Sequence, residues 1–205
     1  MRPNAVRPNA VIIPSCGSNL ASLQFALERL GADVPLTEDP ARIRAASHVI
    51  LPGVGAAAPG MERLAAAGLV ELIPTLTQPV LGICLGMQLL FASSEEEQTP
   101  CLGVIDAEVR RFPPSPDLPV PQMGWNELEP VGQSPLLADV PAGTYAYFVH
   151  SYAAPLGPYT RAKTTYGVPF SAVIEQRNFF GTQFHPERSS RAGAQILDNF
   201  LKIGL

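Results

Sequence analysis

A cysteine flanked by two glycines lies between an apolar, strand-like segment and the start of a predicted helix. The segment is Gly82-Ile83-Cys84-Leu85-Gly86, and it follows Val80-Leu81. This pattern is that of a nucleophile elbow, with cysteine in the serine position. The central residue of such a turn has a strained backbone, and glycines on either side avoid clashes with the neighbouring strand and helix. The dipole of the following helix favours the thiolate, so the pattern predicts Cys84 as a nucleophile.

A thiolate nucleophile needs a base that accepts and returns a proton, and the sequence contains three histidines. One of them, His185, directly follows the predicted strand 179–184 and precedes Pro186 and Glu187. Proline favours extended backbone in the residue before it, and residues two apart in an extended chain face the same side. We therefore predict that the carboxylate of Glu187 orients and polarises the imidazole of His185, as in other catalytic triads.

Acyl transfer also needs hydrogen-bond donors for the negative charge that develops on the substrate oxygen. The geometry of the elbow makes the backbone N–H of Leu85 one candidate. A second donor is expected from Pro52-Gly53-Val54-Gly55, which follows a neighbouring apolar strand. Ligands of open α/β sheets bind beyond the carboxyl ends of the strands, so Gly53 and Val54 are the predicted partners of Leu85 in an oxyanion hole.

The elements that must position these residues alternate between strands and helices in the first half of the chain. We expect strands at 11–13, 34–36, 48–51 and 80–83, and helices at 20–30, 40–46, 61–76 (broken near Gly68) and 87–92. After a proline-rich loop at 112–121, strands are expected at 145–152, 171–176 and 179–184, followed by a C-terminal helix carrying Ala192, Ile196, Phe200 and Ile203 on one face. The prediction is an α/β fold: an open, mostly parallel sheet with helices on both faces, and antiparallel strands in the C-terminal half.

Length and composition limit the class of protein. The chain has 205 residues, 46% hydrophobic and 16% charged, which excludes a disordered chain and fits one domain. A net charge of −4 argues against a nucleic-acid partner, and we expect no membrane contact, no metal and no cofactor. Three cysteines suit a reducing, cytoplasmic compartment. Residues 1–10 contain most of a repeated pentapeptide and are expected to be a disordered or cloning-derived extension, with the domain at 11–205.

The segments around Cys84 and His185 together resemble the class I, triad-type glutamine amidotransferases. The resemblance is carried by Gly82-Ile83-Cys84-Leu85-Gly86-Met87-Gln88 and by Phe184-His185-Pro186-Glu187. Three further segments narrow it to glutaminase subunits of histidine biosynthesis: Leu51-Pro52-Gly53-Val54-Gly55-Ala56, Met123-Gly124-Trp125-Asn126 and Tyr147-Phe148-Val149-His150-Ser151-Tyr152. The resemblance extends from about residue 11 to residue 201.

This resemblance implies hydrolysis of glutamine to glutamate and ammonia through a cysteine thioester. It makes Cys84 the nucleophile, His185 the base and Glu187 its orienting group, and it makes Gln88 and the Gly53 backbone substrate-binding. The implied partner is a (βα)8-barrel cyclase, bound as a heterodimer, to which ammonia is channelled. It places Asn19, Trp125 and His150 at the interface with that partner.

The sequence departs from the family pattern in two places, and two alternatives stay open. Pro14-Ser15-Cys16 stands where the family usually has Asp-x-Gly, and Gln122 stands where it commonly has histidine. By resemblance, both places lie nearer the partner surface and the rim of the glutamine site than the triad. The chain is alternatively the glutaminase subunit of another class I enzyme, of the anthranilate or pyridoxal phosphate synthase type. It is otherwise an inactive regulatory homologue.

Overall fold

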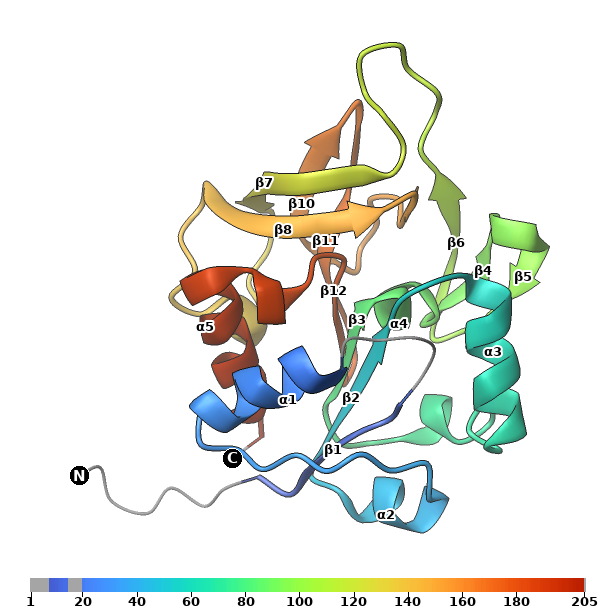
Figure 1. The fold of residues 1–205 in the computed structure, drawn as a ribbon, viewed down its shortest axis with the longest axis vertical. Coiled ribbons are helices and arrows are strands. Elements are labelled where there is room, and N and C mark those ends of the chain that lie inside the picture. Colours follow the sequence, from blue (N-terminus) through green and yellow to red (C-terminus); the bar gives the residue numbers. More distant parts are fainter. Residues whose placement is uncertain (1–7, 15–19, 205) are drawn as a thin grey trace.

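The computed structural model describes residues 8–14 and 20–204, and its central feature is an eight-stranded sheet (Figure 1). The strand order is β1-β2-β3-β12-β11-β10-β7-β8. These strands are β1 (Ala10–Ile12), β2 (His48–Gly53), β3 (Val80–Cys84), β7 (Gln122–Pro130), β8 (Thr144–His150), β10 (Thr160–Tyr166), β11 (Val168–Gln176) and β12 (Phe179–Thr182).

The sheet is mixed, and its two halves differ in strand direction. The pairs β1-β2, β2-β3 and β3-β12 are parallel, whereas β12-β11, β11-β10, β10-β7 and β7-β8 are antiparallel. The predicted α/β class is confirmed, with parallel strands from the first half of the chain and antiparallel strands from the second. The parallel part also recruits β12, from near the C-terminus, so residues that follow β3 and β12 meet at one edge of the sheet.

A second, four-stranded sheet lies beside the first and has the order β5-β4-β6-β9. Its strands are β4 (Phe91–Ser94), β5 (Thr99–Pro100), β6 (Ile105–Arg111) and β9 (Tyr152–Ala153). The predicted helix at 87–92 is wrong here. The helix after the elbow, α4, spans only Leu85–Gln88, and the chain then enters β4, because pairing of Phe91 and Ser93 with β6 replaces further helical hydrogen bonds.

Helices cover both faces of the large sheet (Figure 1). On one face lie α1 (Leu20–Arg29) and α5 (Ser190–Leu201), and on the other lies α3 (Ala57–Ala66). The remaining helical segments are α2 (Pro40–Ala45) and four 3-10 turns: η1 (Ile73–Thr75), η2 (Glu96–Gln98), η3 (Pro135–Leu137) and η4 (Pro186–Arg188). In place of the predicted helix 61–76, α3 begins earlier and ends at Ala66, and only the short turn η1 follows. The chain leaves the helix near Gly68, where φ is +68°.

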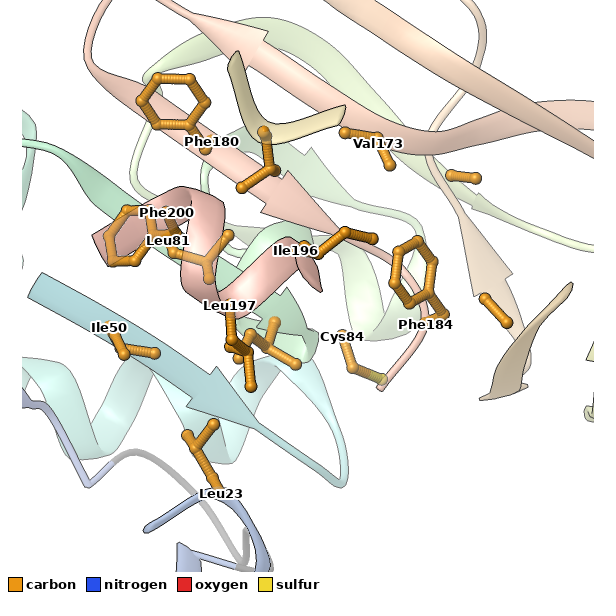
Figure 2. Packing of buried hydrophobic residues seen from close by; sticks show 14 of the residues in the cluster. Leu23, Ile50, Leu81, Cys84, Val173, Phe180, Phe184, Ile196, Leu197 and Phe200 are labelled. Atoms are coloured by element: carbon orange, nitrogen blue, oxygen red, sulfur yellow. The ribbon is translucent and has the colours of Figure 1, made fainter. Parts of the chain in front are cut away.

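Alternating strand residues build one hydrophobic core on each face. In β2, Ile50 joins the core of α1 and α5, whereas Val49 and Leu51 join the core of α3. Figure 2 shows the first of these cores, in which the labelled residues include Leu23, Ile50, Leu81, Ile196, Leu197 and Phe200. Cys84 lies at the end of this cluster, together with Phe184, so the predicted nucleophile is held by the main core.

Two predicted boundaries need correction. Asn9 and Ala10 belong to the fold, because Ala10 starts β1 and the carbonyl of Asn9 accepts a 2.8 Å hydrogen bond from the backbone N–H of Ser47. The predicted strand 34–36 is reduced to a single bridge between Leu36 and Ile12. In the described part of the chain, no helix is long and apolar enough to cross a membrane.

Candidate active site

The turn at Cys84 has the strained backbone that the glycine spacing predicts. Cys84 ends β3 with φ 53° and ψ −110°, a conformation that non-glycine residues rarely adopt. A Cβ atom at Gly82 would lie 2.7 Å from the backbone of Gly86 and Met87. A Cβ atom at Gly86 would lie 1.7 Å from the carbonyl oxygen of Leu51. Both glycines are therefore required for the strand and the turn to pack so closely.

His185 and Glu187 converge as predicted, but by a different backbone path. Nδ1 of His185 lies 2.8 Å from Oε1 of Glu187, and both side chains are buried. His185 is extended, with φ −94° and ψ 99°, but the chain then turns into η4. The expectation that extended backbone continues to residue 187 is wrong, and the 3-10 turn brings the carboxylate back under the imidazole. Because a carboxylate accepts, Nδ1 carries the proton and Nε2 faces away from Glu187.

The charge environment of His185 favours its protonated form. Burial lowers the pKa of His185, but its interactions with Cys84 and with Glu187 outweigh burial and raise the pKa to about 10. Nε2 is buried and has no hydrogen-bond partner that meets the usual geometric limits among the described residues. Cys84 and His185 line the same pocket. The pair is thus arranged for proton exchange between the thiol and Nε2.

A pocket of about 260 Å³ opens beside this pair. It is lined by Cys84 and His185, by Gln88 at the end of α4, and by Val54 from the loop after β2. Residues 149–152, from the end of β8 to the start of β9, also form part of the wall. The volume suits a small, polar molecule, and the carboxamide of Gln88, whose Nε2 already donates to Tyr152 and Gln183, has Oε1 as an acceptor.

The residues predicted for the oxyanion hole lie at the carboxyl ends of adjacent parallel strands. Gly53 is the last residue of β2 and stands directly opposite Cys84 in the strand register. Val54 and Leu85 both line the pocket. A Cβ atom at Gly53 would lie 3.0 Å from Cβ of Leu85, so the two segments are packed against each other. The backbone of these residues is thus placed next to the sulfur.

Glu96 also lines the pocket, although the sequence did not predict it as a site residue. The acidic run at residues 95–97 suggests an exposed charged segment, but Glu96 lines the pocket. Its Oε2 atom accepts a 2.7 Å hydrogen bond from the N–H of Ala57, at the start of α3. The sequence carries no local signal for this position, because Glu96 lies in η2, between the paired strands β4 and β5, and reaches the pocket through the tertiary placement of that hairpin.

The three residues predicted for the partner interface differ in their exposure and in whether the structure describes them. Trp125 lies on β7 and is 52% exposed, as an interface residue of an unbound subunit should be. The prediction that His150 lies at a surface interface is wrong. Its side chain is buried between the rings of Phe112, Phe148 and Phe170, and it lines the pocket beside Cys84. Aromatic packing on β8 turns it inward. Asn19 lies outside the described residues.

One of the two departures from the family pattern lies wholly within the described residues, and it is buried. Gln122 begins β7 and pairs directly with His150 in the register of β7 and β8. Both side chains are almost inaccessible, and Oε1 of Gln122 and Nε2 of His150 lack hydrogen-bond partners among the described residues. Gln122 is thus a buried residue, and the residue before it, Pro121, lines the pocket. Of the other departure, only Pro14 is described.

Comparison with known proteins agrees with this geometry. Residues 12–203 match the family model described as glutamine amidotransferase class-I. The imidazole glycerol phosphate synthase subunit HisH of Xylella fastidiosa is 50% identical over 192 residues, covering 94% of this chain and 96% of that protein. The HisH subunit of Shewanella oneidensis is 49% identical, covering 99% and 100%.

Solved structures agree at the level of the fold. A GMP synthase subunit from Thermoplasma acidophilum superposes with a TM-score of 0.74 at 19% identity, covering 97% of this chain and 94% of the other. The chain therefore belongs to the class-I glutamine amidotransferases and, within them, to the family of HisH subunits of imidazole glycerol phosphate synthase.

Proposed function

We propose that this chain is the glutaminase subunit of an imidazole glycerol phosphate synthase, which hydrolyses glutamine and delivers the ammonia to a cyclase subunit. The observation that carries the proposal is the meeting of Cys84 with the hydrogen-bonded pair His185 and Glu187 at one pocket. Identity of about half the sequence to HisH subunits, over nearly the full length of both chains, supports the same assignment.

The proposed reaction begins from the ion pair in which the Cys84 thiol has already passed its proton to Nε2 of His185, the protonated form that the surroundings of His185 favour. The sulfur attacks the carboxamide carbon of glutamine, and the carbonyl oxygen becomes an oxyanion. His185 returns the proton to the amine, the carbon–nitrogen bond breaks, and ammonia leaves a thioester. A water molecule, deprotonated by His185, then attacks the thioester, and glutamate departs as Cys84 regains its proton. Glu187 stabilises the imidazolium that forms twice in this cycle.

Substrate binding is proposed to use both ends of the pocket. Gln88 and the backbone of Gly53 hold the glutamine near Cys84. The carboxylate of Glu96 has one oxygen bonded to Ala57 N, which leaves Oε1 for the ammonium group of an amino acid. This position favours an α-amino acid over a simple amide. The oxyanion would be bound by backbone N–H groups of Gly53, Val54 and Leu85.

Regulation is proposed to act through the peptide between Gly53 and Val54. Rotation of a peptide next to glycine costs little, and it turns an N–H towards or away from the oxyanion. Loss of one such donor lowers the rate by roughly 10²–10³. We expect low activity of the chain alone and a rise of at least about 10² when the cyclase and its nucleotide are bound. Val54→Pro, which removes the N–H, should abolish this rise, whereas Val54→Ala keeps the N–H and should retain it.

The proposed partner is a (βα)8-barrel cyclase, and the proposed compartment is the cytoplasm. The heterodimer would form imidazole glycerol phosphate by a lyase reaction in histidine biosynthesis. Of the two alternatives, the inactive homologue is disfavoured by the buried His185–Glu187 pair, which an inactive chain has no reason to retain. A class I subunit of another synthase is disfavoured by the identity to HisH subunits.

A glutaminase assay tests the proposal, with and without the cyclase and its nucleotide ligand. Cys84→Ser should lower glutamine hydrolysis by several orders of magnitude, because it removes the nucleophile. The same complex should still form product from ammonium salts, which bypass the glutaminase. Residual hydrolysis within about tenfold of the parent chain would refute the assignment of Cys84. Product formation with an anthranilate-type partner instead of the cyclase would favour the alternative subunit.

A further inference from the structure

The helix that follows Cys84 is too short to explain a stabilised thiolate. The sequence predicts a helix whose dipole acts on the sulfur, but α4 has a single turn, Leu85–Gln88. A macrodipole grows with the number of aligned peptide units, so one turn supplies little of it. The carbonyl oxygen of Val149, 3.9 Å from Sγ, accepts from the thiol and repels the thiolate. Apart from His185, whose protonated ring interacts with Cys84, any further donor to the sulfur must therefore come from another side chain.

The carboxamide of Gln183 supplies such a donor. Gln183 is fully buried, and its Nε2 atom lies 3.8 Å from Sγ of Cys84, within the range of a hydrogen bond to sulfur. Gln183 and His185 both follow β12, where the chain bends at residues 183 and 184, and both lie beside Cys84: Gln183 through the contact of Nε2 with Sγ, and His185 as a residue that lines the same pocket. Phe184, between them, points into the hydrophobic core (Figure 2).

The neighbours of Gln183 decide which end of its amide faces the sulfur. The carbonyl of Tyr152 can only accept, so the atom of Gln88 that lies 2.8 Å from it is the nitrogen Nε2. That same nitrogen lies 3.0 Å from Gln183, which must therefore present its oxygen, Oε1. The nitrogen of Gln183 is then left for Cys84.

The hydrogen bonds that orient Gln88 and Gln183 extend further, to His150. The Tyr152 carbonyl also accepts from Nδ1 of His150, at 2.7 Å. His150, Gln88 and Gln183 thus form one buried chain of hydrogen bonds that ends at the nucleophile. Each amide orientation depends on the one before it, and the backbone carbonyl of Tyr152 sets the direction.

We propose that Gln183 is a further catalytic residue, whose amide N–H stabilises the thiolate of Cys84 while its oxygen fixes Gln88 at the substrate pocket. This inference rests on the proposed role of Cys84 as nucleophile. A hydrogen bond to an ionised acceptor is stronger than one to a neutral acceptor, so the amide favours the thiolate over the thiol. Gln183 therefore serves both the reactive sulfur and the residue that holds the substrate.

Two substitutions separate these two effects. Gln183→Glu keeps an oxygen for Gln88 but replaces the donor to Sγ by a carboxylate, which repels the thiolate once it is ionised. Gln183→Met has a similar shape and removes both hydrogen bonds. Gln133→Glu introduces the same charge at an exposed position and serves as the control.

The measurement is the rate of iodoacetamide alkylation of Cys84 in the chain without glutamine, followed by mass spectrometry between pH 6 and 8.5, with Cys101 as an internal reference. We expect Gln183→Glu to slow alkylation of Cys84 by at least about tenfold at pH 8 and by less at pH 6, where a buried glutamic acid keeps its proton and can donate. Gln183→Met should slow it at every pH, and Gln133→Glu should not.

Steady-state kinetics of the complex with the cyclase provide the second measurement. Gln183→Glu should lower kcat for glutamine by at least about tenfold with KM within about threefold, whereas Gln183→Met should also raise KM. Parental alkylation rates in both variants, or a loss in Gln183→Glu that is equal at every pH, would overturn the role of Gln183. The alkylation rates do not depend on glutamine hydrolysis, so they test Gln183 alone. Failure of the proposed function would appear in a different experiment, as glutamine hydrolysis retained in Cys84→Ser.

Discussion

At the residue scale, two buried histidines owe their charge to their immediate neighbours. His185 is held in its protonated form by Cys84 and Glu187, which together overcome its burial. His150 has no such partners. Burial in an aromatic cluster lowers the pKa of His150 to about 4, the Tyr152 carbonyl opposes this shift, and the charge of His185 adds to it. The two histidines of one pocket are therefore expected to carry different charges at neutral pH.

Replacement of Glu187 by glutamine is expected to be milder than loss of His185. Glu187→Gln keeps a hydrogen-bond acceptor near Nδ1, and Pro186 and the N–H of His185 still fix the backbone, the latter by a 3.0 Å bond to Tyr147 O. His185→Ala removes the base and should lower kcat by a further factor of at least about 10. The variant Glu187→Gln should also lower the pKa of His185, as measured by NMR titration. Equal and complete loss of activity in both variants would mean that Glu187 contacts substrate directly.

Burial of a neutral His150 should make the fold sensitive to acid. An unfolded chain takes up a proton at this histidine near pH 6.5, whereas the folded chain resists until about pH 4. The contribution of His150 to the free energy of unfolding should thus be largest above pH 6.5, and it should fall as the pH drops towards 4. Urea unfolding of the parent and of His150→Gln at pH 7, 6 and 5 measures this, and the variant should show the smaller fall. Parallel curves would contradict a neutral, buried His150.

At the scale of elements, the site is assembled from segments that end at one edge of the large sheet. β2 brings Gly53, β3 brings Cys84, and β12 leads to His185. The turn η4 is held from two sides: Ser189 Oγ donates to the carbonyl of His185, at 2.7 Å, and accepts from the N–H of Tyr147 on β8, at 3.0 Å. The positions of the proposed base, His185, and of the Glu187 carboxylate thus depend on how α5, β8 and η4 pack together.

Among these elements, α5 and η4 approach each other most closely at Gly193, and Gly193→Ala should displace η4. A Cβ atom there would lie 1.8 Å from the carbonyl oxygen of Pro186. Helix propensity alone predicts that alanine stabilises α5 by about 1 kcal/mol. We expect the opposite sign, a loss of about 1–3 kcal/mol in the free energy of unfolding, together with reduced glutamine hydrolysis.

A matched control is Gly132→Ala, whose Cβ would lie 3.4 Å from the flexible side chain of Arg161 and 3.8 Å from the carbonyl oxygen of Thr160, both ordinary contact distances. It should change stability and activity little. A stabilised Gly193→Ala variant with full activity would show that α5 can move away from η4 without affecting the site.

At the scale of the whole molecule, the antiparallel end of the sheet presents an apolar outer face next to the active site. Met123 and Trp125 on β7 and Tyr145 on β8 are 66%, 52% and 53% exposed. Tyr147, opposite Trp125 in the register, lies edge-on to it and also beneath the guanidinium of Arg188. Large exposed side chains of this kind mark protein interfaces, and Arg188 directly follows Glu187.

Trp125→Ala is expected to weaken binding of the (βα)8-barrel cyclase by at least about tenfold, because aromatic anchors dominate interface energies. Val131→Ala removes a residue of similar exposure, 51%, beyond the far end of β7, and should leave the affinity unchanged. Titration calorimetry with the cyclase measures both. An unchanged affinity for Trp125→Ala, or equal losses in the two variants, would place the interface elsewhere.

Local sequence patterns were sufficient to predict the elbow and the class of fold. Spacing of Gly82, Cys84 and Gly86 is a property of one turn, and the close backbone contacts at both glycines have the steric reason that the sequence suggests. Alternation of apolar strands and helical periodicity were sufficient for the α/β class. The pairing of His185 with Glu187 was also predictable from their separation of two residues, although the turn that brings them together was not.

Which other side chains reach the pocket follows from tertiary packing alone. Gln183 meets Cys84 across 99 residues of sequence, Glu96 meets Ala57 across 39, and Gln88 meets Tyr152 across 64. These contacts depend on the alignment of β12 with β3 and on the second sheet, and helix propensity after Cys84 was overridden by pairing of β4 with β6. Local patterns cannot encode such contacts, because long-range strand pairing is set by the burial of both sheet faces rather than by neighbouring residues.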